Sequence, residues 1–221
     1  MESNPNKKAL IEGYMQSILK VNEKLNLTRI SDLENAELLH ILDSLAIIDE
    51  INEAPDGKYI DLGSGGGFPG VPIAIISERE TVLIDSVKKK MTAVNQILKD
   101  LNISNIETVG ERIEDYSKEH PEEFSVITAR AVSSIPALLE LASPLSKHGG
   151  HLILMKSHEV EPYDKEKALI ELGLKEIGFR EYNLKDDDIY RCVLVFEKVG
   201  DHSPKLPRRT GMAQKRPIAA I

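Results

Sequence analysis

The chain has 221 residues, of which 41% are apolar and 29% are charged, and its formal net charge is −8. This length allows one sizeable domain with a hydrophobic core, and the composition is ordinary for a soluble globular protein. The single cysteine, Cys192, excludes an intramolecular disulfide, and its apolar surroundings predict a core position. We expect a cytoplasmic protein, because the first residues lack the profile of a signal peptide and no apolar stretch approaches the ~18 residues of a membrane span.

Residues 1–54 predict an N-terminal helical extension that packs on the core. Six apolar residues recur there at helical spacing, namely Leu10, Ile11, Tyr14, Met15, Ile18 and Leu19. A capping box at residues 31–34 predicts the start of a second helix.

Short apolar strands alternate with helical stretches after residue 55, which predicts a parallel sheet covered by helices on both faces. The five expected strands cover residues 58–62, 81–85, 106–110, 124–130 and 151–156. Two further strands, at 174–184 and 189–198, are joined by an acidic turn at 185–188, so they should be antiparallel. This α/β, Rossmann-like layout of seven strands over residues 55–199 resembles that of class I methyltransferases, which use S-adenosylmethionine (SAM).

The loop after the first strand is rich in glycine, with Gly63, Gly65, Gly66 and Gly67 followed by Gly70. A loop at this position lies at the ligand-binding edge of a doubly wound sheet. A tight turn alone needs one or two glycines, so the loop predicts a nucleotide-type ligand.

Two cofactors compete for this loop. The dinucleotide fingerprint G-x-G-x-x-G fails when counted from Gly63, because Phe68 stands at its third glycine. Counted from Gly65 it fits formally but begins late in the loop. Pro69 and Pro72 also remove N–H groups that a pyrophosphate would need. The spacing of Gly63, Gly65 and Gly67 after Asp61 instead resembles the first motif of SAM enzymes, and SAM carries no phosphate.

Two acids follow the next strands. Asp85 can accept hydrogen bonds from the ribose hydroxyls of NAD or SAM, or it can cap the following helix. Glu114 can accept from an adenine amino group while the N–H of Ile113 donates to the ring, or it can be a first-turn helix acid.

The methyl acceptor is constrained by what the chain lacks. Residues 128–134 read TARAVSS and not the Asn/Asp-Pro-Pro-aromatic motif of exocyclic-amine methylation, and no cysteine nucleophile follows a central strand. The acceptor should therefore already be nucleophilic, as guanine N7 is, and no acid or base is required. Arg130 can position the acceptor, contact SAM or form a salt bridge at the sheet edge.

Several segments together resemble the bacterial 16S rRNA guanine-N7 methyltransferase family, also called glucose-inhibited division protein B. They are NLTRI, HILDSLAI, DLGSGGGFPGVPIAI, LIDSVKKK, TARAV and PRRTGMAQKRPI, and the resemblance spans nearly the whole chain. It implies a 16S rRNA or small-subunit precursor as target. Apart from the resemblance, we expect a monomer. The resemblance also implies SAM bound by Gly63, Phe68, Ile113, Glu114 and Arg130, with Asp85 near the ribose. The matching residues Asn26, Thr28, His40 and Asp43 either cap the cleft or join helices.

Positive charge is concentrated at two places despite the acidic total. Residues 200–221 predict a basic C-terminal arm without an apolar period, which should add little to the core. The candidates for RNA binding are Lys88, Lys89, Lys90, Lys156, Arg208, Arg209, Lys215 and Arg216. The three adjacent lysines are equally consistent with a solvated helix face.

No metal site is predicted. A small-molecule methyltransferase, or a ribosome-assembly factor that binds SAM without catalysis, stays an alternative, whereas the failed fingerprint disfavours an NAD-dependent oxidoreductase.

Overall fold

The computed structural model describes residues 5–25, 37–130, 132–157, 160, 162–184 and 189–221. Asn26, Thr28, the capping box at 31–34 and the acidic turn at 185–188 lie outside the described residues.

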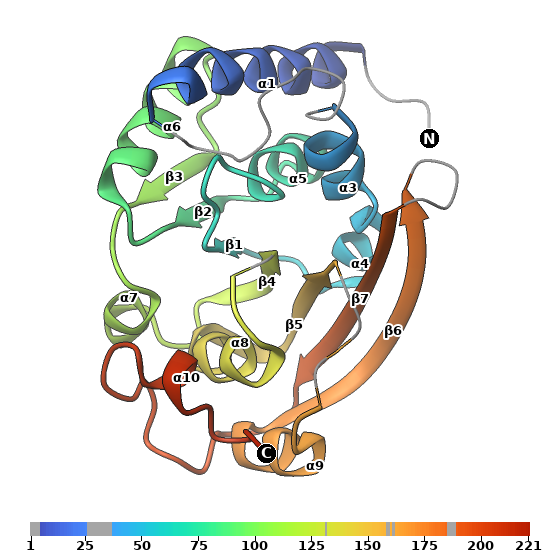
Figure 1. Cartoon of the computed structure of the whole chain (residues 1–221), viewed down its shortest axis with the longest axis vertical. Coiled ribbons are helices and arrows are strands. Elements are labelled where there is room, and N and C mark those ends of the chain that lie inside the picture. The colour runs from blue at the N-terminus through green and yellow to red at the C-terminus, as the bar shows by residue number, and fades with distance from the viewer. Residues whose placement is uncertain (1–4, 26–36, 131, 158–159, 161, 185–188) are drawn as a thin grey trace.

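A seven-stranded sheet runs through the middle of the molecule in the order β3-β2-β1-β4-β5-β7-β6 (Figure 1). The strands are β1 (Tyr59–Leu62), β2 (Thr81–Ile84), β3 (Ile106–Val109), β4 (Phe124–Arg130), β5 (Ser146–Lys156), β6 (Leu174–Leu184) and β7 (Ile189–Lys198). The first five are parallel, and β7 pairs antiparallel with both β5 and β6. This confirms the predicted mostly parallel sheet with an antiparallel last strand.

The predicted strand limits are confirmed closely except at β5, which begins at Ser146 and not at residue 151. Its first residues are polar or glycine, so no apolar alternation marks them, yet Ser146 pairs with Phe124 of β4. A register shift between Phe124 and Val126 accommodates the extra length.

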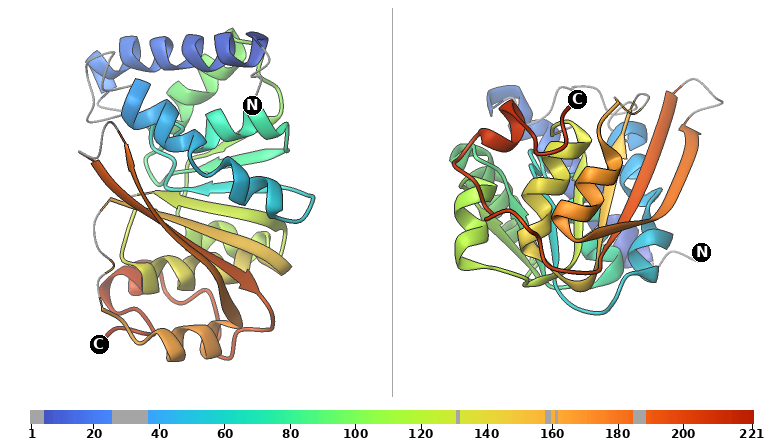
Figure 2. Two further views of the ribbon diagram at one scale, coloured as in Figure 1. Left: turned by 90° about the vertical axis from the view of Figure 1, so that its right-hand side faces the viewer. Right: turned by 90° about the horizontal axis from the view of Figure 1, so that it is seen from below.

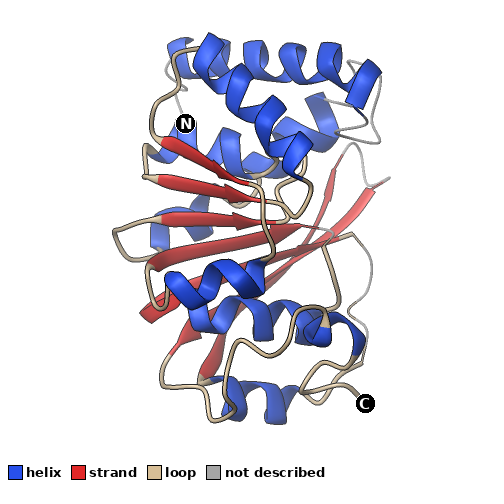
Figure 3. Cartoon of the chain, turned by 90° about the vertical axis from the view of Figure 1, so that its left-hand side faces the viewer, coloured by secondary structure: helices blue, strands red, loops and turns tan. Residues whose placement is uncertain are grey.

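Helices cover both faces of the sheet (Figure 3). On one face lie α5 (Gly70–Ser77), α6 (Lys88–Asp100), α4 (Ile48–Glu53) and α3 (Asp43–Leu45), the last preceded by a π-helical turn, η1 (Glu37–Leu42). On the other lie α7 (Ile113–Glu119), α8 (Ile135–Ala142) with the 3-10 turn η2 (Ser143–Leu145), α9 (Lys165–Leu172) and α10 (Met212–Lys215). Within the described ranges, no helix is long and apolar enough to cross a membrane.

Helix α1 (Pro5–Leu25) lies outside α5 and α6 and reaches the glycine loop. Its Tyr14 is fully buried and donates a hydrogen bond to the carbonyl oxygen of Gly66 at 2.9 Å. A Cβ at Gly67, whose φ is +82°, would collide with the Tyr14 hydroxyl. The N-terminal helix therefore supports the loop from behind.

The C-terminal tail, which we define as residues 200–221, packs along α8 and α9 (Figure 2). Ala213 and Ala219 are 2% and 1% exposed and belong to the same core cluster as the residues of α8. The expectation that this segment adds little to the core is therefore wrong. Its apolar contacts are too few and too irregularly spaced to produce a period. Cys192, in contrast, is fully buried as predicted.

Candidate functional site

A cavity of about 630 Å³ opens at the carboxyl ends of the central strands, where ligands of parallel α/β sheets bind. Its walls come from the loops after β1, β2, β3 and β4 and from the C-terminal tail. The lining residues are Gly63, Ile84, Asp85, Ser86, Glu111, Arg112, Ile113, Glu114, Val132, Thr210, Gly211, Gln214 and Lys215. We call this space the first cavity.

Gly63 forms the floor of the first cavity at the end of β1. Its φ is +68°, and a Cβ there would collide with Val132 from the loop after β4. Only glycine satisfies both demands, so the backbone stays accessible to a ligand.

Asp85 joins the glycine loop to the turn after β2. Its Oδ2 accepts from the N–H of Gly65 at 3.1 Å, and its Oδ1 accepts from the N–H of Val87 at 2.8 Å. The residue at the N-cap of α6 is Val87, so Asp85 orders the turn and does not cap the helix itself. Each carboxylate oxygen keeps a second acceptor site, which a ligand hydroxyl can use.

Glu114 lies in the first turn of α7 and is 3% exposed. Its Oε1 accepts from the backbone N–H of Gly211 at 2.7 Å, so the tail and this carboxylate are joined at the cavity wall. Ile113 lines the same wall. Phe68 does not line it: the ring is buried, stacked on His40 with centroids 4.4 Å apart and edge-on to Tyr14.

Asp61 stands beneath the loop, fully buried and outside the cavity lining. It accepts from the Thr128 hydroxyl at 2.7 Å and from the N–H of Gly70 at 3.0 Å, and burial raises the pKa of its carboxyl to about 7. The N–H of Gly70 is thus occupied at the start of α5, and Pro72 has none. The first turn of α5 consequently has few free N–H groups for a pyrophosphate. This agrees with the expectation from the sequence that the loop binds SAM and not a dinucleotide.

A second cavity, of about 200 Å³, lies at the carboxyl ends of β4 and β5 beside the N-terminal helices. Its lining residues are Leu39, His40, Asp43, Arg130, Met155, Lys156, Ser157 and Arg191. Arg130 is therefore placed here and does not line the first cavity. Lys156 is 7% exposed and donates to the carbonyl oxygen of Ser133 at 2.9 Å.

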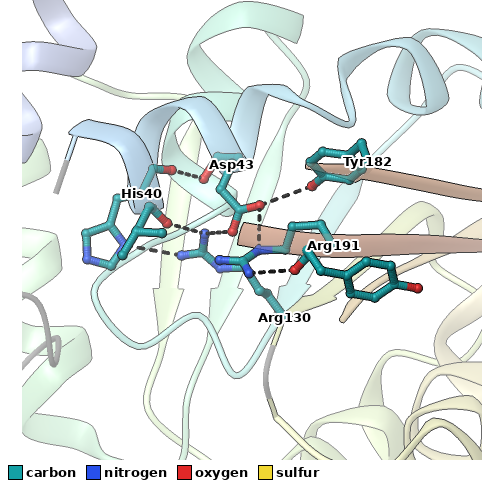
Figure 4. Close-up of polar contacts among 8 residues, drawn as sticks. His40, Asp43, Arg130, Tyr182 and Arg191 are labelled. Carbon is teal, nitrogen blue, oxygen red and sulfur yellow. Dashed lines mark hydrogen bonds and ion pairs between the residues drawn. The ribbon is translucent and has the colours of Figure 1, made fainter. Parts of the chain in front are cut away.

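Asp43 is the centre of the polar network in the second cavity (Figure 4). Its Oδ2 accepts from Arg130 at 3.0 Å, and its Oδ1 accepts from Arg191 at 3.1 Å and from the Tyr182 hydroxyl at 3.0 Å. The carboxylate is only 2% exposed, whereas the two arginine side chains are 15% and 13% exposed. Two cations share one anion, so the network keeps a net positive charge at the cavity wall.

His40 completes this network as a neutral ring. Its Nδ1 lies 3.3 Å from Nη2 of Arg130, and burial together with the Arg130 charge lowers the pKa of His40 to about 4. The guanidinium also donates to the carbonyl oxygen of Leu39 at 2.9 Å. His40 and Asp43 thus hold Arg130 in place, while Asn26 and Thr28 lie outside the described residues.

The candidate RNA-binding residues are distributed over different environments. Lys88 and Lys89 are exposed at the start of α6, Lys90 is half-buried, and Arg209 and Arg216 are exposed. Lys215 lines the first cavity. Arg208 differs, because its Nε and Nη2 donate to the two oxygens of the buried Glu140 carboxylate at 2.6 Å each, and Nη2 also donates to the carbonyl oxygen of Arg216.

Sequence reasoning missed Arg191, which lines the second cavity, Tyr182, which donates to Asp43, and Glu140, which binds Arg208 of the C-terminal tail. Arg191 interrupts the apolar strand β7, and Glu140 interrupts the apolar helix α8. A charge inside an otherwise apolar element was the available signal, because such a group needs a partner when it is buried.

Two solved structures resemble the chain in fold. The YcgJ protein from Bacillus subtilis aligns with 73% of this chain and 100% of its own at a TM-score of 0.58 and 10% identity. A protein from Listeria monocytogenes, assigned as an S-adenosylmethionine-dependent methyltransferase, aligns with 72% of this chain and 99% of its own at a TM-score of 0.53 and 12% identity. Together with the strand order, they confirm the class I SAM-dependent methyltransferase fold.

Relatives of known name are far more similar in sequence. The ribosomal RNA small subunit methyltransferase G of Desulfitobacterium hafniense is 35% identical, over 93% of this chain and 87% of its own. That of Oenococcus oeni is 36% identical, over 96% and 90%. The model of the GidB family, described as rRNA small subunit methyltransferase G, matches residues 7–187. The chain is therefore a member of the rRNA small subunit methyltransferase G family.

Proposed function

We propose that this chain transfers the methyl group of SAM to N7 of a guanine in 16S ribosomal RNA. The observation that carries the proposal is the pairing of two cavities at one sheet edge. The first is built from the glycine loop and two carboxylates, and the second is lined by Arg130, Lys156 and Arg191. Family membership supports a small-subunit rRNA target.

The first cavity fits SAM by the chemistry of its lining. Gly63 lacks the Cβ that would fill the floor, and Ile84, Ile113 and Val132 supply apolar walls. Asp85 would accept from the ribose hydroxyls, and Glu114 from the adenine amino group, with the N–H of Ile113 beside the ring. When bound, SAM supplies an electrophilic methyl carbon on a sulfonium. Gly65 and Gly67 shape the loop, and Phe68 packs behind it.

The second cavity suits a guanine nucleotide. Guanine presents O6 and N7 as acceptors, and a guanidinium can donate to O6 or to a flanking phosphate. We propose this role for Arg130, held by Asp43, with Lys156 adding positive charge at the same wall. Guanine N7 carries a lone pair and no proton, so positioning is sufficient and His40, neutral at pH 7, is not required as a base.

We further propose that the enzyme acts as a cytoplasmic monomer on 16S rRNA or on a small-subunit precursor. Lys88, Lys89, Lys90, Arg209 and Arg216 would contact phosphates near the cavities. Arg208 is left out of this set because its guanidinium binds Glu140.

The test is incubation with labelled SAM and RNA at successive stages of subunit assembly, followed by mass spectrometry of the digested nucleosides. We expect label in 7-methylguanosine from 16S rRNA. Binding of SAM without transfer to any RNA would indicate a non-catalytic assembly factor, and label only in small molecules would indicate a different methyltransferase. Either result would overturn the proposal.

A further inference from the structure

The C-terminal tail lies across one side of the first cavity. Thr210, Gly211, Gln214 and Lys215 all line the cavity, although Val132, the nearest other lining residue in the sequence, lies 78 positions before Thr210. Figure 1 shows α10 of the tail beside α8 and close to α7, and α10 contacts α8.

Polar and apolar contacts outside the cavity hold the tail in place. The side chain of Glu140 in α8 is 2% exposed and accepts two hydrogen bonds from Arg208 and one from the backbone N–H of Ile218, at 3.1 Å. Ala213 and Ala219 of the same segment are buried in the core cluster that includes residues of α8. A carboxylate with three donors from one segment is specific to the docked position of that segment, because undocking would remove all three hydrogen bonds at once.

A hydrogen bond connects the docked tail to a carboxylate that lines the first cavity. Glu114 lines the cavity, and its Oε1 accepts from the N–H of Gly211. The position of the tail therefore sets the orientation of the carboxylate that would face the adenine.

We propose that residues 208–219 form a wall of the SAM pocket, so that cofactor retention requires the docked tail and bound cofactor in turn stabilises docking. Such coupling is reciprocal, because a ligand that contacts both the body and the tail favours the state in which they are together. The inference rests on the cofactor assignment of the proposed function but not on the identity of the methyl acceptor.

Hydrogen exchange on the unaltered protein is the first test, with S-adenosylhomocysteine as the probe. We expect saturation with the probe to slow amide exchange in residues 209–216 by roughly fivefold or more. Amide exchange around Gly149, which lies near the amino end of β5 and therefore at the sheet edge opposite to the cavity, should not change. Unaltered exchange in residues 209–216 would overturn the inference, provided that calorimetry shows the probe bound.

A matched pair of glycine substitutions is the second test. Gly211 and Gly149 have φ values of +80° and +78°, and a Cβ at either would meet nothing within 4 Å. Valine should strain the backbone equally at both positions. We expect Gly211→Val to weaken binding of S-adenosylhomocysteine about tenfold or more, and Gly149→Val to change it less than about twofold.

The outcomes separate the inference from the proposed function. Equal affinities for Gly211→Val and the unaltered protein, or equal losses in both variants, would overturn the inference alone. If the unaltered protein binds no S-adenosylhomocysteine, the cofactor assignment and the inference both fail. If Gly211→Val does not fold, the exchange measurement still decides.

Discussion

Arg130 at the end of β4 donates to Asp43 of α3 across 3.0 Å, although the two residues are 87 positions apart. The same carboxylate binds Arg191 from β7. One buried anion thus ties the central sheet, the antiparallel hairpin and the N-terminal helices together at the wall of the second cavity.

Removal of this anion should destabilise the protein. Asp43→Ala leaves two largely buried guanidiniums without their partner, so we expect the free energy of unfolding to fall by about 3 kcal/mol. Asp49→Ala removes an exposed acid of the neighbouring helix α4 and should change it by less than about 0.5 kcal/mol. Urea denaturation of both variants measures the difference, and equal small effects would show that the network adds no stability.

Arg130 should affect transfer more than cofactor binding. It lines the second cavity and not the first, so Arg130→Ala should reduce RNA methylation about a hundredfold and change SAM affinity by less than about threefold. Lys58→Ala, which removes a cation bound to Glu123 at the opposite edge of the sheet, is the control. A parallel loss of turnover and affinity would place Arg130 in contact with SAM instead.

Asp85 should contribute directly to cofactor affinity. Asp85→Ala removes both the expected ribose acceptor and the carboxylate that orders Gly65, so SAM binding should weaken by ~1–3 kcal/mol in calorimetry. Asp100→Ala, at the end of α6 and outside the cavity, is the matched loss of one negative charge. An unchanged dissociation constant for Asp85→Ala would restrict this residue to ordering the turn.

The tail anchor should contribute to global stability. Arg208→Ala leaves the Glu140 carboxylate buried without its main partner, and we expect a loss of about 3 kcal/mol in the free energy of unfolding. Arg209→Ala makes the same charge change at an exposed position and should be nearly neutral. Equal melting temperatures for the two variants would contradict the anchoring role of Arg208.

Asp61 should make stability depend on pH. Burial raises the pKa of this carboxyl from 3.8 to about 7, so the folded protein binds a proton that the unfolded chain has already released. The contribution of Asp61 is therefore greatest below pH 4 and is lost as the pH rises to about 7. The protonated form can donate to the Thr128 hydroxyl, which then donates to Tyr59, and an asparagine amide can do the same.

We therefore expect Asp61→Asn to gain stability relative to the unaltered protein between pH 5 and pH 8. Urea denaturation of both proteins at pH 5 and at pH 8 measures this gain. The change in the difference between their urea midpoints reports the titration of Asp61, because both proteins share all other titrating groups. A difference that does not vary with pH would show that the carboxyl titrates in its ordinary range.

The local pattern of the sequence was sufficient to predict the sheet. The limits of β6 and β7 and the alternation of strands and helices follow from hydrophobic periodicity bounded by polar turns, which acts over a few residues. The glycine loop was equally predictable, because positive φ and close approach require residues without a Cβ. Asp85 and Glu114 follow strands at the edge where ligands bind, so their place in the first cavity could also be predicted from the sequence.

Only the tertiary structure decided how the charged residues are shared among these sites. Arg130, Arg191 and Tyr182 meet Asp43 because β4, β7 and β6 converge beside α3, and no local spacing records that meeting. Arg208 looks like its neighbour Arg209 in the sequence, yet it is 68 positions from the buried Glu140 that it binds. Whether a charged side chain can contact RNA, a ligand or a buried partner depends on which residues it faces after folding. A partner that the chain topology brings from a distant part of the sequence leaves no periodic pattern near that side chain.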